Sequence, residues 1–188
     1  MMESNVMTYD RRADVLSEQV VALFEAYHEP IFGYVYRLVD DAEWAHDLVQ
    51  ETFLRLFETR DRLADVSNPR AWVYRIASNL ALNALKRRRR FSWLPWRDGD
   101  AWHDASRGSL PDPAEAVQLQ RQVSRALARL TPDYRAPLLL YSHFDFTVRE
   151  VAEALELSEG AVKTRLYRAR EKFREAYSED EVQNEVDK

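Results

Sequence analysis

The sequence predicts an all-α protein of two small helical domains joined by a flexible linker, the C-terminal one with a helix-turn-helix. Its 188 residues include only four glycines, and strand-like alternation of apolar and polar residues is nearly absent. Hydrophobic residues make up 46% of the chain, which is enough for packed cores. They recur at helical spacing on both sides of an aperiodic stretch, residues 92–112, that is broken by glycines and prolines.

The N-terminal part begins with an acidic leader, residues 1–18, that we expect to be frayed. Helical periodicity then covers residues 19–39. Pro30 lies inside this pattern and predicts a kink or a break in the helix. Asp40 and Asp41 end the pattern.

A second helix is predicted from Ala42 to about Arg60, because its apolar side chains fall on one face. A loop at residues 61–68 separates it from a third helix, which Pro69 is well placed to open and which runs to about Arg88. The outward face of the second helix carries three polar side chains, Asp47, Gln50 and Glu51.

The third helix combines a core stripe with a cation-rich surface. Seven cations and no anion lie between Asn68 and Arg90. A separate polar stripe at helical spacing comprises Arg75, Asn79, Asn83 and Lys86. Trp72 has two interpretations, burial in the core or stacking on DNA. The three helices together define a first domain, residues 19–91.

A second domain is predicted over residues 113–177, between the linker and an acidic tail, residues 178–188. It begins with a long helix, residues 114–130, and a short helix that starts near Thr131. The linker contains three tryptophans, which are unusual in an inert tether, so we expect it to dock on a surface. They are Trp93, Trp96 and Trp102.

The helix-turn-helix lies between Thr147 and Arg174. Apolar residues at i, i+3, i+4 and i+7 form one stripe in its first helix, and Ser158 is placed to cap the second. Six cations against one anion lie between Ala161 and Arg174, a composition that suits a DNA-reading helix. Glu156 occupies a turn position that favours glycine, at a cost of about 1 kcal/mol at most.

The net charge of −5 is unevenly distributed, because the cations gather in these two helices while acids dominate the termini and the second helix. Two basic patches on an acidic body suit a protein that contacts nucleic acid at two places and a cationic surface elsewhere. Ordinary solvation of two polar helix faces is the plainer alternative.

Four segments, in order and at matching spacing, resemble bacterial RNA polymerase sigma factors of the extracytoplasmic-function (ECF) group. They are AHDLVQETFLRLF from Ala45, NPRAWVYRIASNLALNALKRRRR from Asn68, LTPDYRAPLLLY from Leu130, and the helix-turn-helix. The resemblance covers about residues 19–176. It implies an alternative sigma factor that binds core RNA polymerase, directs it to promoters and starts promoter opening.

The resemblance also implies partners and roles: the β′ clamp and β of core polymerase, promoter DNA, an anti-sigma factor, and no cofactor. Core-polymerase binding is assigned to Asp47, Gln50 and Glu51. Binding of the −10 element is assigned to Leu63, in the loop that receives a flipped base, and to Arg75, Asn79, Asn83, Lys86, Arg87 and Arg88. Binding of the −35 element is assigned to Lys163, Thr164, Arg165, Tyr167 and Arg168. The chain departs from the family pattern at His46, Asp145 and Glu156.

Two other functions remain open. A helix-turn-helix regulator independent of polymerase needs only the second domain and leaves the first unexplained. An enzyme has little support, because the four histidines lack ligand-like spacing and no phosphate-binding loop is present, so neither catalytic residues nor metal ligands are expected. The absence of cysteine and of any apolar run long enough to span a membrane predicts a cytoplasmic protein without membrane insertion.

Overall fold

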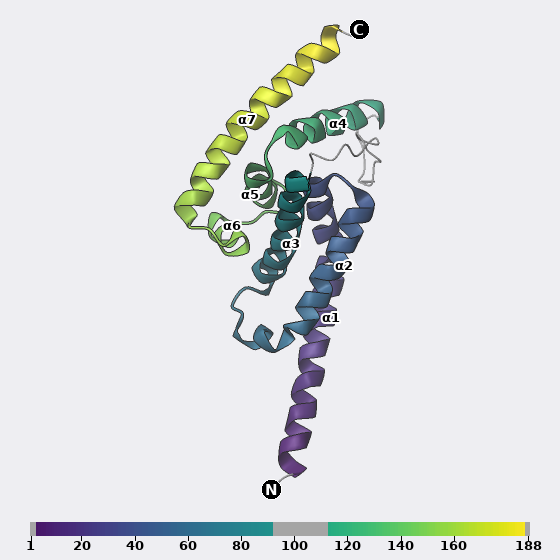
Figure 1. Cartoon of the computed structure of the whole chain (residues 1–188), viewed down its shortest axis with the longest axis vertical. Coiled ribbons are helices and arrows are strands. Elements are labelled where there is room, and N and C mark those ends of the chain that lie inside the picture. Colours follow the sequence, from purple (N-terminus) through teal and green to yellow (C-terminus); the bar gives the residue numbers. More distant parts are fainter. Residues whose placement is uncertain (1–2, 92–112, 187–188) are drawn as a thin grey trace.

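The computed structural model describes residues 3–91 and 113–186, and within these ranges its secondary-structure elements are all helices. In order they are α1 (Glu3–Val39), α2 (Ala42–Glu58), the 3-10 helix η1 (Arg60–Asp65), α3 (Pro69–Phe91), α4 (Pro113–Arg129), α5 (Pro132–Ser142), α6 (Val148–Leu155) and α7 (Glu159–Val186) (Figure 1). The predicted all-α class is confirmed. The three linker tryptophans and their expected docking lie outside the described residues.

The first domain is a bundle of α1, α2 and α3, with η1 packed against α1 and α2. Asp41 begins α2 as an N-cap, since its side chain accepts a hydrogen bond of 3.0 Å from the Trp44 backbone N–H. The hydroxyls of Tyr34 and Ser78 lie 2.9 Å apart and join α1 to α3 inside the bundle. Fully buried apolar side chains from all three helices form the core, among them Ile31, Val35, Leu38, Val49, Leu56, Val73 and Ala77.

Two helices are longer than the sequence predicted. α1 begins at Glu3, within the leader that was expected to be frayed, and continues through Pro30 without a break. An interior proline removes one backbone hydrogen bond and costs about 3 kcal/mol. Ile31 and Tyr34, both fully buried, fix the helix directly after that point, and their packing offsets the cost. α7 likewise runs on through the predicted tail to Val186.

The second domain consists of α4 to α7, and its helix-turn-helix is formed by α6 and α7. Thr147 and Glu150 form a reciprocal capping box at the start of α6, with the Glu150 carboxylate 2.8 Å from the Thr147 backbone nitrogen. Ser158 accepts a bond of 3.2 Å from the Ala161 N–H, so the predicted cap of α7 is confirmed. Glu156 ends α6 with φ 54° and ψ 45°, the left-handed conformation expected at this turn.

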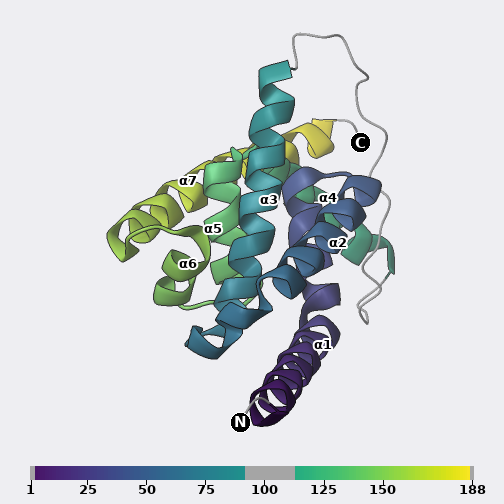
Figure 2. The ribbon, with the colours of Figure 1, turned by 60° about the horizontal axis from the view of Figure 1, so that its bottom comes forward.

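The two domains pack against each other. α6 lies along α3, and α5 contacts both α1 and α3. The ribbon shows α6 beside α3 in both orientations (Figures 1 and 2). Phe144 and Phe146, in the α5–α6 loop, place their rings against Tyr74 of α3, with centroids 5.8 Å and 4.8 Å apart. An aromatic cluster therefore connects the helix-turn-helix to the first domain.

Candidate nucleic-acid interface

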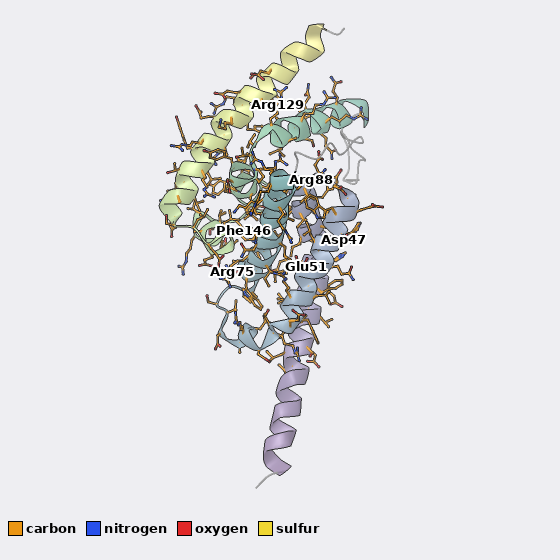
Figure 3. The ribbon with its side chains drawn as sticks, in the orientation of Figure 1. Asp47, Glu51, Arg75, Arg88, Arg129 and Phe146 are labelled. Carbon is orange, nitrogen blue, oxygen red and sulfur yellow. The ribbon has the colours of Figure 1, made fainter. Side chains whose placement is uncertain are left out.

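The outward face of α2 presents the acidic and amide groups that the sequence singled out. Asp47 and Gln50 are exposed, whereas the Glu51 carboxylate forms an ion pair of 2.7 Å with Arg55, one turn further along the helix. Asp47 and Glu51 lie on the side of the molecule away from α6 and α7 (Figure 3). This face offers hydrogen-bond acceptors to a basic partner on a side that α7 leaves open.

The stripe along α3 is only partly available at the surface. Asn79 and Asn83 are exposed and Arg75 is half-buried, while Trp72 is 7% exposed, which favours its interpretation as a core residue. Exposed cations continue the stripe toward the C-terminal end of α3, where the Arg88 guanidinium lies over the Trp44 ring at 5.2 Å (Figure 3). We call the following set the α3 polar surface: Arg75, Asn79, Asn83, Lys86, Arg87 and Arg88.

A hollow opens beside this surface where α2, η1 and α3 meet, and we call it the basic hollow. Its lining includes three guanidinium groups, which suit a phosphate, beside the edge of the buried Trp72 side chain. The residues that line it are Arg55, Glu58, Thr59, Arg62, Trp72, Arg75, Ile76, Asn79 and Glu156. Glu156 alone among them comes from the second domain.

Leu63 differs from expectation. Its side chain is 7% exposed and belongs to the core beneath η1, so in this structure it supports the turn and does not face a ligand. The helical pattern cannot reveal this, because η1 is a 3-10 helix in which side chains three residues apart eclipse. The exposed polar residues of the same turn, such as Arg62, are the ones that face the basic hollow.

The N-terminal half of α7 presents a second polar face. Val162, Leu166 and Ala169 are buried against the rest of the second domain and so turn the opposite side of the helix outward. Tyr167 is 66% exposed, more than any other large apolar or aromatic side chain whose exposure the structure describes. Exposed with it are Lys163, Thr164 and Arg168.

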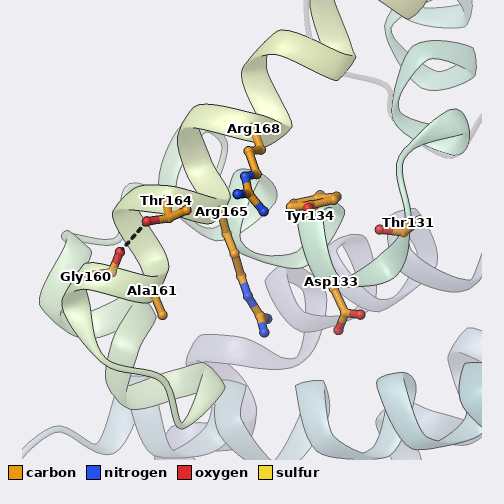
Figure 4. A pocket seen from close by; sticks show the side chains of 8 residues that line it. All are labelled: Thr131, Asp133, Tyr134, Gly160, Ala161, Thr164, Arg165 and Arg168. Atoms are coloured by element: carbon orange, nitrogen blue, oxygen red, sulfur yellow. Dashed lines mark hydrogen bonds between the residues drawn. The ribbon is translucent and has the colours of Figure 1, made fainter.

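A shallow pocket lies between this face and the start of α5 (Figure 4). Arg165 and Arg168 of α7 project into it beside the ring of Tyr134. The Thr164 hydroxyl donates a hydrogen bond of 3.0 Å to the Gly160 carbonyl, which leaves its oxygen lone pairs available to a partner. Two guanidinium groups and a phenol beside an exposed helix face are suited to a nucleic-acid backbone.

The residues that join the domains are the ones that the sequence did not identify. Arg135 is 8% exposed and donates hydrogen bonds to carbonyls in both domains, at 3.1 Å to Leu38 and at 2.6 Å and 3.0 Å to Ala128 and Leu130. Burial lowers the pKa of Arg135 from its ordinary value. Arg70, one of the seven cations between Asn68 and Arg90, lies over the Phe146 ring at 4.1 Å. An arginine in a helical pattern does not reveal whether it faces solvent or a neighbouring domain.

Two other kinds of site find no support in the part of the chain that the structure describes. No group of three His, Asp or Glu side chains there lies close enough to hold a metal ion. Among the same residues, no helix combines the length and the apolar character needed to cross a membrane.

Comparison with known families matches both domains. The family described as Sigma-70 region 2 matches residues 23–91, and the one described as Sigma-70, region 4 matches residues 120–173. Together they take in the second half of α1, all of α2 and α3, and the helix-turn-helix up to the middle of α7, which include the two polar faces.

Three curated relatives align with this chain over most of their own length. The ECF RNA polymerase sigma factor SigX of Bacillus subtilis is 28% identical over 181 residues, covering 90% of this chain and 93% of that protein. The RNA polymerase sigma factor CarQ of Myxococcus xanthus is 28% identical over 174 residues, covering 93% of this chain and 98% of CarQ. The ECF RNA polymerase sigma factor SigL of Mycobacterium tuberculosis is 29% identical over 149 residues, covering 79% of this chain and 82% of SigL.

Solved structures share the fold. The sigma factor RpoE of Bartonella quintana, in complex with the anti-sigma factor NepR, has a TM-score of 0.70 and 24% identity, covering 86% of this chain and 98% of that one. CnrH, in complex with the cytosolic domain of CnrY, has a TM-score of 0.60 and 22% identity, covering 88% of this chain and 97% of CnrH. The two region matches and the aligned sigma factors lead to one conclusion: the chain belongs to the extracytoplasmic-function group of bacterial RNA polymerase sigma factors.

Proposed function

We propose that this protein is an alternative sigma factor that binds core RNA polymerase, recognises promoters at two elements and starts promoter opening. The observation that carries the proposal is the presence of two basic, hydrogen-bonding helix faces, on α3 and α7, in the two domains that match sigma-70 regions. A regulator that acts alone has no use for the first of these faces or for the acidic face of α2.

The three faces have separate tasks in this proposal. Asp47, Gln50 and Glu51 of α2 bind the β′ clamp of core polymerase, and the second domain contacts β. The α3 polar surface and the basic hollow hold the −10 element, where cations bind the backbone and a flipped base stacks or inserts. Lys163, Thr164, Arg165, Tyr167 and Arg168 of α7 read the −35 element in the major groove and bind its backbone.

The protein contributes binding free energy to promoter opening and performs no bond chemistry of its own. It therefore acts in the cytoplasm, where core polymerase and the chromosome are found. Because RpoE and CnrH are known in complexes with an anti-sigma factor or a cytosolic partner domain, we propose that an anti-sigma factor masks these faces in this protein as well.

The deciding experiment is in vitro transcription with purified core polymerase and a genomic fragment library, with and without the protein. Discrete start sites that depend on the protein are expected, and their upstream sequences define its −10 and −35 elements. If transcription stays at background while the protein alone binds specific DNA tightly, the polymerase-independent regulator is the better description.

A further inference from the structure

Glu156 is in an unfavourable position for its residue type. It closes the turn between α6 and α7 in the left-handed region, with φ 54°, where a residue with a Cβ is strained and glycine is not. Strain of this kind persists only where the surrounding structure holds it, and it often accompanies a functional contact.

The Glu156 side chain makes such a contact across the domain boundary. Its Oε2 accepts a hydrogen bond of 3.2 Å from the Asn79 side-chain amide, near the middle of the α3 polar surface. Its carboxylate also helps to line the basic hollow, together with Arg62 and Arg75. The second domain thus places a carboxylate beside guanidinium groups that suit a phosphate.

Neighbouring contacts hold α6 and its preceding loop in the same position. Arg70 donates a hydrogen bond to the Phe144 carbonyl, and the Asn68 amide lies 3.4 Å from the Glu150 carboxylate. The Arg135 bond to the Leu38 carbonyl, 3.1 Å long, fixes the start of α5 against the end of α1. We call this arrangement of the two domains the closed form.

A carboxylate and a DNA phosphate compete for the same donors. Both present anionic oxygens that accept hydrogen bonds from amide and guanidinium groups. Asn79 cannot direct the same N–H to Glu156 and to DNA, and α6 lies along the helix that carries it. A nucleic acid that uses this part of α3 must therefore displace Glu156.

We propose that Glu156 is an internal competitor of promoter DNA, and that the closed form is an autoinhibited state of the free protein. Its carboxylate occupies the part of the α3 polar surface assigned above to the −10 strand, so the inference rests on that proposed function. Polymerase binding separates the domains and exposes the surface, whereas the free protein is kept from binding single-stranded DNA.

The test measures binding of the free, full-length protein to single-stranded DNA by fluorescence anisotropy. The probe is a fluorescein-labelled oligonucleotide with the −10 non-template strand of a promoter mapped by the transcription experiment. Glu156→Gln removes the charge at constant size, and Glu156→Gly also relieves the left-handed strain. Glu153→Gln is the matched control, because it removes a carboxylate from the same helix, one that pairs with Arg149 at 3.2 Å.

Both Glu156 variants are expected to bind the probe about fivefold more tightly than the wild-type protein, since a larger fraction of molecules is open. Glu153→Gln is expected to leave the affinity within about twofold. Once the protein is assembled with core polymerase, all variants bind a forked promoter equally. Thermal unfolding confirms that each is folded, and Glu156→Gly is expected to be at least as stable as the wild-type protein.

Two outcomes overturn autoinhibition. One is an unchanged affinity for the probe in both Glu156 variants. The other is an equal gain in affinity in Glu153→Gln, which would mean that the loss of any negative charge on α6 strengthens DNA binding. A separate variant tests the function on which the inference rests. Asn83→Ala with Lys86→Ala changes two exposed residues that lie outside the basic hollow. If it leaves probe binding unchanged, the assignment of α3 to the −10 strand fails. If it weakens binding while the Glu156 variants do nothing, only the inference about Glu156 fails.

Discussion

Glu150 shows how a single side chain serves both a helix and a domain boundary. Its carboxylate caps α6 through the Thr147 N–H and lies 3.4 Å from the Asn68 amide of the first domain. The Thr147 backbone hydrogen bond is the largest cause of a lowered Glu150 pKa, because it favours the charged form. A carboxyl group whose pKa is lowered on folding stabilises the protein above its unfolded pKa, and this contribution disappears as the pH falls through the folded value.

Glu150→Gln is therefore expected to lower the free energy of unfolding by about 0.5–1 kcal/mol near neutral pH, where the charged cap is complete. The difference from the wild-type protein should shrink as the pH falls below the ordinary Glu value of 4.5. Urea unfolding at a series of pH values measures it. Glu153→Gln on the same helix, which makes no cap, is the control, and a difference that persists at the lowest pH would contradict this account.

At the scale of single residues, the sequence predicts local features such as helix caps and turns, but not contacts between distant parts of the chain. The Ser158 cap and the left-handed turn at Glu156 depend on residues within a few positions, so the pattern alone identifies them. Arg135 joins Leu38 to Leu130, positions far apart in the chain, and nothing in its neighbourhood indicates that it is buried. Its role depends on which backbone carbonyls the fold brings together.

The helix faces are the elements whose functions can be tested separately. On α2, Asp47 and Gln50 are exposed, whereas Glu51 already pairs with Arg55. Changing the first two to Ala is expected to weaken binding to core polymerase by about tenfold or more, because each removes an interaction worth roughly 1 kcal/mol. Glu18→Ala with Gln19→Ala removes an acid and an amide from the exposed part of α1 and should leave core affinity unchanged. Competition against a labelled sigma factor gives both affinities.

On α7, Lys163→Ala with Arg168→Ala is expected to weaken binding of assembled polymerase to a promoter with a −35 element by about 30-fold or more, since each base or phosphate interaction is worth about 1–3 kcal/mol. The slope of log affinity against log salt should fall by about 1 for each phosphate that the variant no longer binds. Because both side chains are exposed, stability should change by less than about 0.5 kcal/mol.

The matched control on α7 is Lys172→Ala with Arg174→Ala, which removes two exposed cations beyond the proposed reading face. Anisotropy titrations of a promoter fragment across a range of salt concentrations compare the pairs. An equal loss of affinity in both would mean that charge alone, without a defined face, accounts for −35 binding.

Helix boundaries were predictable where a capping residue marks them. They were not predictable where tertiary packing lets a helix continue through a helix-breaking residue. Ser158 caps α7 as predicted, and α2 begins at Ala42 as predicted, with Asp41 as its N-cap. The continuous α1 through Pro30 was not predicted, because the buried side chains that offset the proline lie on partners elsewhere in the chain. The burial of Leu63 was not predicted for a related reason: the turn that carries it is a 3-10 helix, whose repeat of three residues the sequence pattern does not reveal.

For the whole molecule, the sequence predicted two domains but not their contact. Each domain has its own apolar stripes, and periodicity finds these without a partner. Docking depends on shape complementarity between Phe146, which is 2% exposed, and the Tyr74 and Arg70 side chains that cover it. An aromatic residue in a loop before a helix gives no sign of which surface it will fill.

This interface predicts that the two domains unfold together. Phe146→Ala leaves a cavity at the junction between the domains. Buried Phe→Ala substitutions lower the free energy of unfolding by about 3–5 kcal/mol. Differential scanning calorimetry should therefore show one transition for the wild-type protein and two for the variant, as docking fails before either domain does. Phe53→Ala, which removes an 8% exposed ring from the first domain alone, should lower stability without separating the transitions in the same way. Two transitions in the wild-type protein would mean that the closed form contributes little stability, and the barrier to opening would then be small.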